Sequence, residues 1–287
     1  MAKVVPVRLA YAEYQPSSGK EVSSNPVIFL HGATLSKESF QDLPQVIADG
    51  ANRKVFALDA RNHGDSEYTD VFNFDINVDD LFHFMDTASI QKAVLIGHSM
   101  GGITAINAAL RKPERIEMIF VEDIYTKKVP KEQLVEIAGF IQIWVASVQS
   151  VPKELNYTDA LRYACDVFYS KLPPDTPDLP SKEIFCKHNF PFGRTANGDY
   201  YLKLNKEVLY KAFMDAETLM SESSGQFDGP AYFLYGTLSE FRVWEEEENI
   251  RKHFPSVELI GFEDAKHDIH MEFREKFIST VLNLLKS

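Results

Sequence analysis

This chain of 287 residues has only two cysteines, no long apolar run and no excess of positive charge. Its two cysteines, Cys165 and Cys186, have neither CxxC nor metal-site spacing, so we expect two buried thiols in a reducing compartment. No apolar run approaches the roughly 20 residues that a membrane-spanning helix needs. The formal net charge of -12 argues against nucleic acid and anionic membrane surfaces as partners.

Targeting signals are also missing from the start of the chain. The first residues form neither the apolar core of a signal peptide nor an Arg- and Ser-rich transit helix, which predicts a cytoplasmic protein for the sequence as given. Hydrophobic residues make up 45% and charged residues 25%, as is typical of globular proteins. The length suits one large α/β domain with an insertion.

One stretch joins an apolar strand to a helix through a Gly-x-Ser-x-Gly turn, Gly97-His98-Ser99-Met100-Gly101. We expect the strand at 93–96 and the helix at 103–110, which is the context of a nucleophile elbow. Such a turn strains its central residue, and glycines stand where a Cβ would clash. The Met100 amide and the helix dipole would favour negative charge beside Ser99. The alternative interpretation is a turn of small residues before a helix without a catalytic role, because the Gly-x-Ser-x-Gly pattern often occurs by chance.

Short apolar strands alternate with helices along both ends of the chain, which predicts a mainly parallel sheet covered on both faces. His31, Asp59, Ser99 and Asp123 follow strand ends, so they should gather at one edge of the sheet, where ligands bind. We expect strands at 4–14 (an edge strand), 27–30, 55–58, 93–96, 118–121, 231–235 and 257–260, and helices at 40–49, 78–87, 103–110 and 273–285.

The alternation stops between residues 126 and 226, where helical periodicity dominates. We expect helices at 133–148, 157–172 and 206–220, and a hairpin or extended segment within 189–204. The predicted organisation is a core of residues 1–125 and 227–287 with an inserted, mostly helical cap at 126–226. Apolar cap residues facing the sheet would line an acyl pocket, for which the candidates are Thr34, Phe140, Trp144 and Phe168.

A run of four glutamates at 245–248 resembles a metal site in composition. It is better explained as the start of a helix, because Glu247 and Glu248 precede Arg251 and Lys252 by four residues. We expect no metal ion and no organic cofactor.

A serine nucleophile needs a general base, and eight histidines compete for that role. His98 lies inside the elbow and cannot turn back onto Ser99. His31 and His63 follow strand ends, where packing and backbone hydrogen bonds explain them. His83, His188 and His253 are expected in surface or core positions. His267 lies between the last strand and the last helix, where a loop would cover the nucleophile, so it is the predicted base, with His270 as the alternative.

The acid that orients the base is less clear from the sequence. The chain order Ser, acid, His leaves the ends of two strands, 118–121 and 231–235. The later loop carries Ser239 where many proteins of this architecture have aspartate, with Glu240 beside it. Asp123 is therefore the predicted acid, Glu240 is the main alternative, and Glu122 is a weaker one.

These strings resemble the α/β-hydrolase superfamily. His31-Gly32, Asp59-Ala60-Arg61-Asn62-His63-Gly64-Asp65-Ser66, the elbow and Ala265-Lys266-His267 recur there in this order, over roughly residues 5–286. The nearest branch is the one called α/β-hydrolase domain-containing protein eleven, with its bacterial esterase relatives. The resemblance implies a serine esterase or lipase-like enzyme of lipid metabolism, an acid on the strand before the cap, and an oxyanion hole formed by the amides of Ala33 and Met100.

Three departures from that branch bear on the substrate and the compartment. The turn after His31-Gly32 reads Ala-Thr-Leu-Ser, and Asp268 stands where an aromatic residue commonly follows the histidine. The mitochondrial presequence of the branch is absent, so a mitochondrial location would require that a presequence was omitted.

The sequence thus predicts a Ser99-Asp123-His267 enzyme that cleaves a small, lipid-like carboxylic ester through an acyl-enzyme. The alternative is a ligand-binding or receptor protein on a hydrolase scaffold, with slow or no turnover. Dehalogenation on the same fold needs a carboxylate nucleophile, which Ser99 excludes. The sequence does not indicate the oligomeric state.

Overall fold

The computed structural model describes residues 5–19, 22, 24–173, 176, 179–188 and 190–286. Val4 and Asn189, where we placed the starts of a strand and of a hairpin segment, lie outside the described residues. Within the described part of the chain, no helix is long and apolar enough to cross a membrane.

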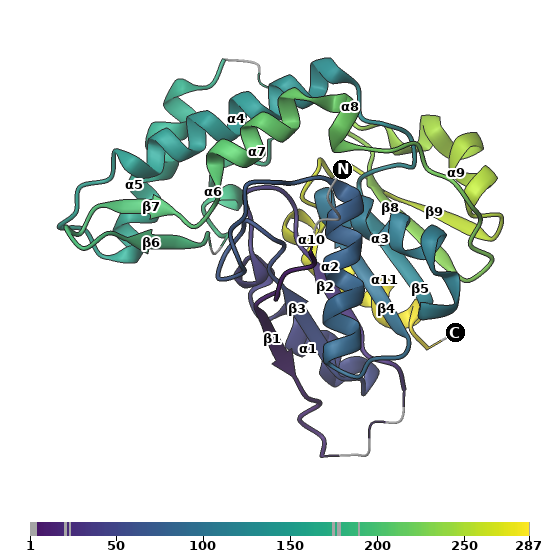
Figure 1. The fold of residues 1–287 in the computed structure, drawn as a ribbon. Coiled ribbons are helices and arrows are strands. Elements are labelled where there is room, and N and C mark those ends of the chain that lie inside the picture. Colours follow the sequence, from purple (N-terminus) through teal and green to yellow (C-terminus); the bar gives the residue numbers. More distant parts are fainter. Residues whose placement is uncertain are drawn as a thin grey trace.

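A seven-stranded sheet lies at the centre of the molecule (Figure 1), in the order β1-β3-β2-β4-β5-β8-β9. β1 pairs antiparallel with β3, and all other neighbours are parallel, as predicted. The edge strand is shorter than expected, because only four of its residues pair with β3. The strands are β1 (Tyr11–Tyr14), β2 (Val27–Leu30), β3 (Val55–Leu58), β4 (Ala93–His98), β5 (Ile116–Glu122), β8 (Ala231–Gly236) and β9 (Val257–Phe262).

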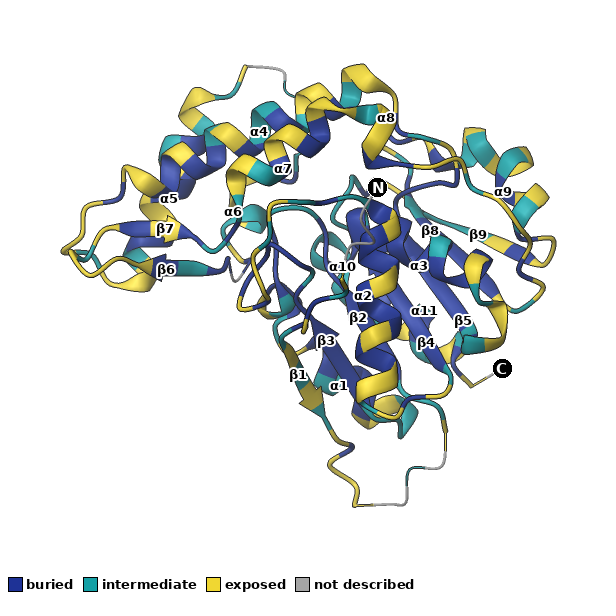
Figure 2. Ribbon diagram, viewed as in Figure 1, coloured by how far each residue is buried: buried dark blue, intermediate teal, exposed yellow. Residues whose placement is uncertain are grey.

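Helices cover both faces of the sheet, and the buried strands supply a core to each face (Figure 2). Successive strand residues point to opposite faces, so Ile28 and Leu30 join one core while Val27 and Phe29 join the other. The first core contains residues of α2 (Phe74–Thr87), α3 (Met100–Arg111) and α9 (Glu247–His253). The second contains residues of α1 (Leu43–Ala51), α10 (Ile269–Glu272) and α11 (Arg274–Leu284).

The segment predicted as a cap forms a separate layer of helices beside the sheet, drawn in teal and green in Figure 1. The hairpin is present, and the helix expected at 206–220 is interrupted after Met214, where Asp215 caps a second short helix. The elements of this segment are α4 (Lys131–Gln149), α5 (Tyr157–Lys171), α6 (Lys182–Phe185), β6 (Phe192–Arg194), β7 (Tyr200–Leu202), α7 (Lys206–Met214) and α8 (Ala216–Leu219).

Two smaller expectations have different outcomes. The glutamate run does lead into a helix, and Glu247–Arg251 and Glu248–Lys252 form the expected ion pairs at 2.7 and 3.4 Å. The expectation of two buried thiols is wrong for Cys186, which is only partly buried because it ends the short helix α6. Short 3-10 turns complete the described elements, at Lys37–Phe40 (η1), Pro113–Arg115 (η2) and Val243–Glu246 (η3).

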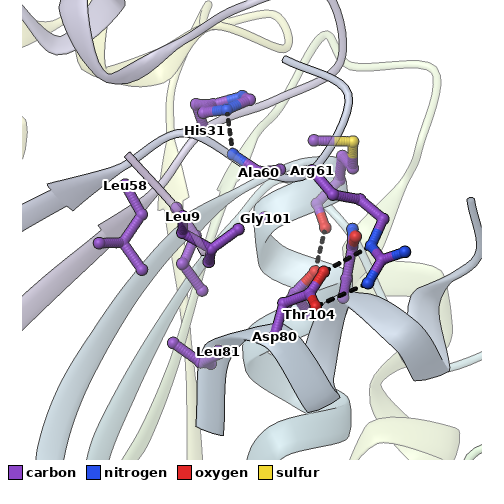
Figure 3. A pocket seen from close by; sticks show the side chains of 12 residues that line it. Leu9, His31, Leu58, Ala60, Arg61, Asp80, Leu81, Gly101 and Thr104 are labelled. Carbon is purple, nitrogen blue, oxygen red and sulfur yellow. Dashed lines mark hydrogen bonds and ion pairs between the residues drawn. The ribbon is translucent and has the colours of Figure 1, made fainter. Parts of the chain in front are cut away.

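The string Asp59 to Ser66 is a loop held together by its own polar side chains. Arg61, fully buried, forms a bidentate pair with Asp80 of α2 at 2.6 and 2.7 Å (Figure 3). Lys37 Nζ donates to Asp59 at 2.6 Å and contacts Asp65 at 3.0 Å. The Asn205 amide donates to Asn62 O at 2.9 Å, so the loop also ties the cap segment to the core. Its role in this structure is therefore architectural.

The elbow turn between β4 and α3 has the tight geometry expected from its glycines. Ser99 adopts φ 50° and ψ -113°, a sparsely populated conformation. A Cβ on Gly97 would lie 2.3 Å from Gly101 O, and a Cβ on Gly101 would lie 2.1 Å from Leu30 O. Both contacts are to backbone atoms that cannot move aside, so the turn requires glycine at these two positions.

We therefore expect Gly101→Ala to lower the free energy of unfolding by at least about 2 kcal/mol, because the added methyl group meets backbone. Gly139→Ala is the matched control, since Gly139 lies in α4 with nothing within 4 Å of its added Cβ. That change should raise stability by roughly 1 kcal/mol through helix propensity. Urea denaturation followed by circular dichroism measures both, and a Gly101→Ala protein as stable as the wild type would contradict the steric argument.

Candidate active site

Asp123 lies directly after β5, buried, in a left-handed conformation with φ 53°. Its Oδ2 is 2.7 Å from His267 Nδ1 and accepts from Ser239 Oγ at 2.5 Å, and its Oδ1 accepts from the Gly236 amide at 3.0 Å. A carboxylate can only accept, so His267 Nδ1 carries the proton and Nε2 is left with the lone pair. The structure thus brings together the predicted acid and the predicted base.

Burial raises the pKa of Asp123, and hydrogen bonds from His267, Ser239 and Gly236 act against that rise without cancelling it. The carboxylate is therefore held by three donors in a desolvated position. Ser239 was considered in the sequence only because it fills the usual acid position of the later loop. In the structure, Ser239 does not take the role of the acid. Its hydroxyl group donates to the carboxylate of Asp123, which follows β5.

His267 packs between an aromatic ring and a second histidine. The Phe241 ring stacks on it with centroids 4.6 Å apart, and the His98 ring lies 4.8 Å away. His98 Nε2 also contacts the carbonyl oxygen of His267 at 3.2 Å. The His267 side chain remains 18% exposed and lines the same cavity as Ser99, so it is accessible from the side of the nucleophile.

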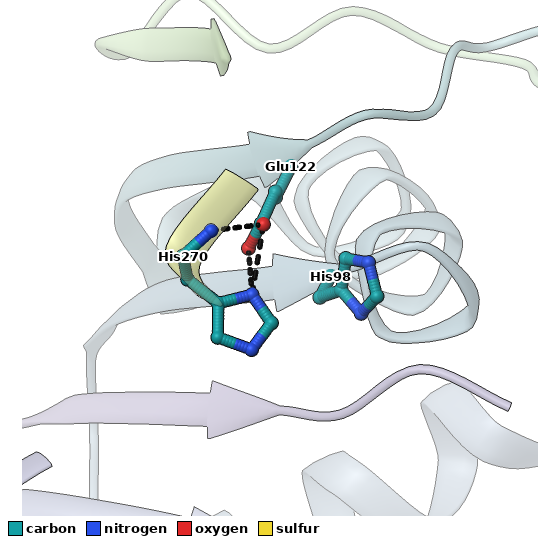
Figure 4. A group of neighbouring side chains, drawn as sticks. All are labelled: His98, Glu122 and His270. Carbon is teal, nitrogen blue, oxygen red and sulfur yellow. Dashed lines mark hydrogen bonds and ion pairs between the residues drawn. The ribbon is translucent and has the colours of Figure 1, made fainter. Parts of the chain in front are cut away.

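The alternative residues from the sequence have different positions. Glu240 is exposed, and the contact with His267 is made by Asp123. His270, the alternative base, is buried, and its backbone amide and Nδ1 both lie 2.8 Å from Glu122 Oε1 (Figure 4). Glu122, the weaker acid candidate, therefore pairs with His270, the alternative base. Glu122 directly precedes Asp123, and His270 lies three residues after His267.

The Glu122–His270 pair is held together by charge as well as by hydrogen bonds. Burial raises the pKa of Glu122, but His270 and His98 lower it more, and the net pKa is below the ordinary value. Burial lowers the pKa of His270, but Glu122 raises it more, and the net pKa is above the ordinary value. The pair therefore anchors α10, and with it the loop that carries His267, to the end of β5.

Two side-chain groups among the described residues have the composition of a metal site. His98, Glu122 and His270 place one donor atom each within 4.8 Å of one another. His270 Nδ1 donates to Glu122, however, so ligation by that atom would require loss of its proton and of this bond. In the second group, Glu38, Asp59 and Asp65, the Lys37 ammonium already pairs with all three carboxylates.

The remaining strand-end histidines are explained by hydrogen bonds. His31 Nδ1 contacts Gly32 O at 2.7 Å, its Nε2 accepts from the Ala60 amide at 3.0 Å, and His63 Nδ1 contacts Arg61 O at 2.8 Å. Burial lowers the pKa of His31 to about 4 and that of His63 to about 3, so both rings are neutral at neutral pH.

A cavity of about 170 Å³ lies between the core and the cap segment, with Ser99 and His267 in its wall. The four pocket candidates from the sequence all line it, and so does Ala33. Ala33, Ser99 and Met100 also share the wall of a smaller adjoining cavity of about 30 Å³. Two other apolar cap residues of the predicted kind, Ile141 and Phe190, also line it. The sequence did not indicate the remaining lining residues, which are Leu35, His98, Ile137, Leu179, Phe185, His188, Phe241 and Asp268.

Comparison with known proteins agrees with this architecture. A family model described as the alpha/beta hydrolase fold matches residues 25–159. The sn-1-specific diacylglycerol lipase ABHD11 of Danio rerio is 30% identical over 288 residues, covering 100% of this chain and 85% of that protein. The chain therefore belongs to the α/β-hydrolase family, and it is a hydrolase of that family.

A further sequence relative and one solved structure were also compared with this chain. Ethanol acetyltransferase 1 of Cyberlindnera fabianii is 28% identical, covering 96% of this chain and 85% of that protein. Among solved structures, one described as a marine microorganism esterase superposes with a TM-score of 0.76 at 23% identity, covering 96% of this chain and 99% of that chain. The latter likeness is one of fold.

The two alternative acids differ in what their removal should do to stability. Glu122→Ala leaves the His270 ring and amide buried without their acceptor, so we expect the free energy of unfolding to fall by about 3 kcal/mol. Glu240→Ala is the matched control, because Glu240 is exposed, and its effect should stay within roughly 0.5 kcal/mol. Urea denaturation at pH 7 compares the two, and equal losses would show that the buried pair does not anchor the loop.

Proposed function

We propose that this protein is a serine hydrolase that cleaves carboxylic esters with apolar acyl groups. The observation that carries the proposal is the 2.7 Å contact between His267 Nδ1 and the buried Asp123 carboxylate, in a loop whose histidine shares a cavity wall with Ser99. The contact fixes the tautomer that leaves Nε2 free of a proton, which is what a general base needs.

In this mechanism Ser99 Oγ bonds to the ester carbonyl carbon while His267 Nε2 takes the hydroxyl proton. Asp123 stabilises the imidazolium that forms. The Ala33 and Met100 amides hold the tetrahedral oxyanion, and loss of one such donor typically costs about 100- to 1000-fold in rate. The carbon–oxygen bond to the alcohol then breaks, and Nε2 returns the proton to the leaving alcohol. Water, deprotonated by the same nitrogen, releases the acid and restores Ser99.

The choice of an apolar acyl group rests on the cavity wall. Aromatic and aliphatic side chains dominate it, with Trp144 packed against Phe168, Phe185 and Phe190 at centroid distances of 5.4, 5.2 and 4.6 Å. Burial of an acyl chain there stabilises the complex by about 0.8 kcal/mol per methylene. The names of the lipase and acetyltransferase relatives are in keeping with an ester-linked acyl group.

A fluorophosphonate probe tests the nucleophile. Wild-type protein should be labelled and should hydrolyse p-nitrophenyl esters, whereas Ser99→Ala should do neither while it keeps its melting temperature. A burst of p-nitrophenol equal to the enzyme concentration, followed by slow release, would instead favour the alternative of a binding protein with little turnover. Retention of more than a few per cent of kcat in Ser99→Ala would contradict the serine mechanism.

A second experiment tests the acid. Asp123→Asn keeps the shape of the side chain but favours the wrong histidine tautomer, so kcat should fall by about 10⁴-fold. Glu240→Gln is the isosteric control and should lose less than tenfold, because Glu240 is exposed and Asp123 already fills the position beside His267. If Glu240→Gln were the inactive variant, the acid would come from the later loop.

A further inference from the structure

A depression outside the cavity of Ser99 and His267 has a strongly acidic wall. Its volume is about 380 Å³, and its wall is formed by the start of α4 and by the loop and turn that follow β8. Five carboxylates and the Arg242 guanidinium group line it. The carboxylates belong to Glu132, Glu136, Glu240, Glu245 and Glu246. The proposed chemistry uses none of these side chains.

The protein neutralises only part of this negative charge. Glu246 pairs with Lys127 at 2.6 Å, and Glu245 lies 3.6 Å from Arg242. The other three carboxylates are exposed and form no ion pair with a described residue; they are those of Glu132, Glu136 and Glu240. The wall therefore has a surplus of hydrogen-bond acceptors for a cationic ligand.

The helix α4 carries two of the unpaired carboxylates on one face. Glu132 and Glu136 are four residues apart, and like charges at this spacing destabilise a helix. The helix dipole offsets the charge of Glu132 in the first turn, but its effect does not extend to Glu136 in the second. A cation held between α4 and Glu240 removes this repulsion.

A buried hydroxyl group at the same depression also lacks a partner. Tyr125 is only 8% exposed and lines the depression, and its hydroxyl group makes no hydrogen bond to a described residue. Burial and the charge of Glu246 raise the pKa of Tyr125 to about 12, so the hydroxyl group is neutral at pH 7. Such a group loses hydration without compensation unless a ligand donates to its oxygen atom.

The spacing of the carboxylates decides which kind of cation fits. A metal ion needs several oxygen atoms around one point. Among the described residues, the groups whose donor atoms lie within 4.8 Å of one another do not include these carboxylates. Charge spread along a wall suits a longer molecule with several amino groups. The rings of Tyr125 and Phe241 in the wall also attract ammonium groups.

We propose that this depression binds an aliphatic polyamine, a flexible chain that carries several ammonium groups. The ammonium groups pair with Glu132 and Glu136 on α4 and with Glu240 on the loop after β8, and one of them donates to the Tyr125 hydroxyl oxygen. Hydrogen bonds of this charge-assisted kind are stronger than those between neutral groups. The ligand therefore joins the inserted segment to the core.

The loop after β8 also connects this site to the proposed acid and base. Ser239 donates to Asp123, and Phe241 stacks on His267 with centroids 4.6 Å apart. Glu240, between these two residues, lines the depression, and Phe241 lies in the walls of both the depression and the cavity of Ser99. A polyamine that holds Glu240 against α4 thus restrains the loop that supports the acid and the base, and we expect it to raise kcat/KM.

Isothermal titration calorimetry of the full chain at pH 7 and low salt tests the site with spermine, a linear tetraamine, and with butylamine, a monoamine. We expect one spermine per chain with a Kd of about 1–100 µM, and binding of butylamine at least about 100-fold weaker. The spermine Kd should rise with salt, which screens exposed charges. Several weak sites per chain, or equal Kd values for the two amines, would overturn the proposal, and so would displacement of spermine by equimolar Mg²⁺.

Substitutions locate the site. The double variant Glu132→Gln, Glu136→Gln removes two unpaired charges, so its spermine Kd should rise by at least about tenfold. The double variant Glu258→Gln, Glu275→Gln is the matched control, because both residues are exposed, lie outside the wall and change the net charge equally. Its Kd should stay within about twofold of the wild type. Tyr125→Phe keeps the ring and should raise Kd about three- to tenfold. Equal effects of the two double variants would overturn the location.

Failure of this site and failure of the proposed function give different results. Saturating spermine should raise kcat/KM on p-nitrophenyl butyrate by about fivefold in the wild type, and should not do so in Glu132→Gln, Glu136→Gln. Binding without a change in rate would support the site and overturn its coupling to the base. If no ester is cleaved, calorimetry still decides whether the site exists. Tighter binding of pentalysine than of spermine would overturn the small ligand in favour of a basic protein segment.

Discussion

The geometry of the site depends on one buried carboxylate. Asp123 is desolvated, yet it accepts hydrogen bonds from three separate parts of the chain: the end of β8, the loop after β8, and the loop before α10. Each donor offsets part of the cost of burying the charge. Backbone hydrogen bonds from Ser239 N to Gly236 O and from Leu238 N to Ala265 O also tie the three segments to one another. The carboxylate therefore fixes the relative positions of the residues around Ser99.

The neighbouring carboxylate on the same strand repeats this arrangement. Glu122 holds His270 as Asp123 holds His267, so the last residue of β5 and the residue after it contact two histidines three positions apart. Because the two acceptors are adjacent at the end of β5, a shift of the histidine loop along the sheet would break both pairs at once. Two contacts restrict the position of the loop more than either contact could alone. A general base needs this restriction, because a small displacement from the reacting proton lowers the rate strongly.

Much of this architecture could be predicted from the sequence because it depends on local patterns. Apolar runs between turns predict the strands, and the elbow glycines indicate a turn too tight for any Cβ. The order of strand ends left both Asp123 and Glu240 as candidates, and Asp123 was chosen because Ser239 fills the usual acid position of the later loop. The Glu122–His270 pair, Ser239 as a donor, and Phe241 against His267 depend on residues far apart in sequence, and no periodicity encodes such meetings.

The contact between His188 and Asp268 is another one that could not be predicted from the sequence. The sequence analysis assigned His188 to an ordinary core or surface position and noted Asp268 only as an unusual neighbour of His267. Their approach to 3.9 Å follows from how the cap segment lies on the core. Local sequence carries little information on that packing, because the intervening loops impose no periodic pattern.

The residues of the proposed chemistry and most of the cavity wall come from different parts of the chain. Ser99, Asp123 and His267 follow strands of the sheet, whereas Phe140, Trp144, Phe168 and His188 belong to the inserted segment. The hydrogen bonds that hold Asp123 and His267 together come from the sheet and its loops, so replacements in the insertion can change the shape and polarity of the cavity while these bonds are kept. In a protein built this way, substrate recognition can change during evolution faster than the chemical step. Homologous proteins can acquire new ligands through changes in the inserted segment and keep the same nucleophile.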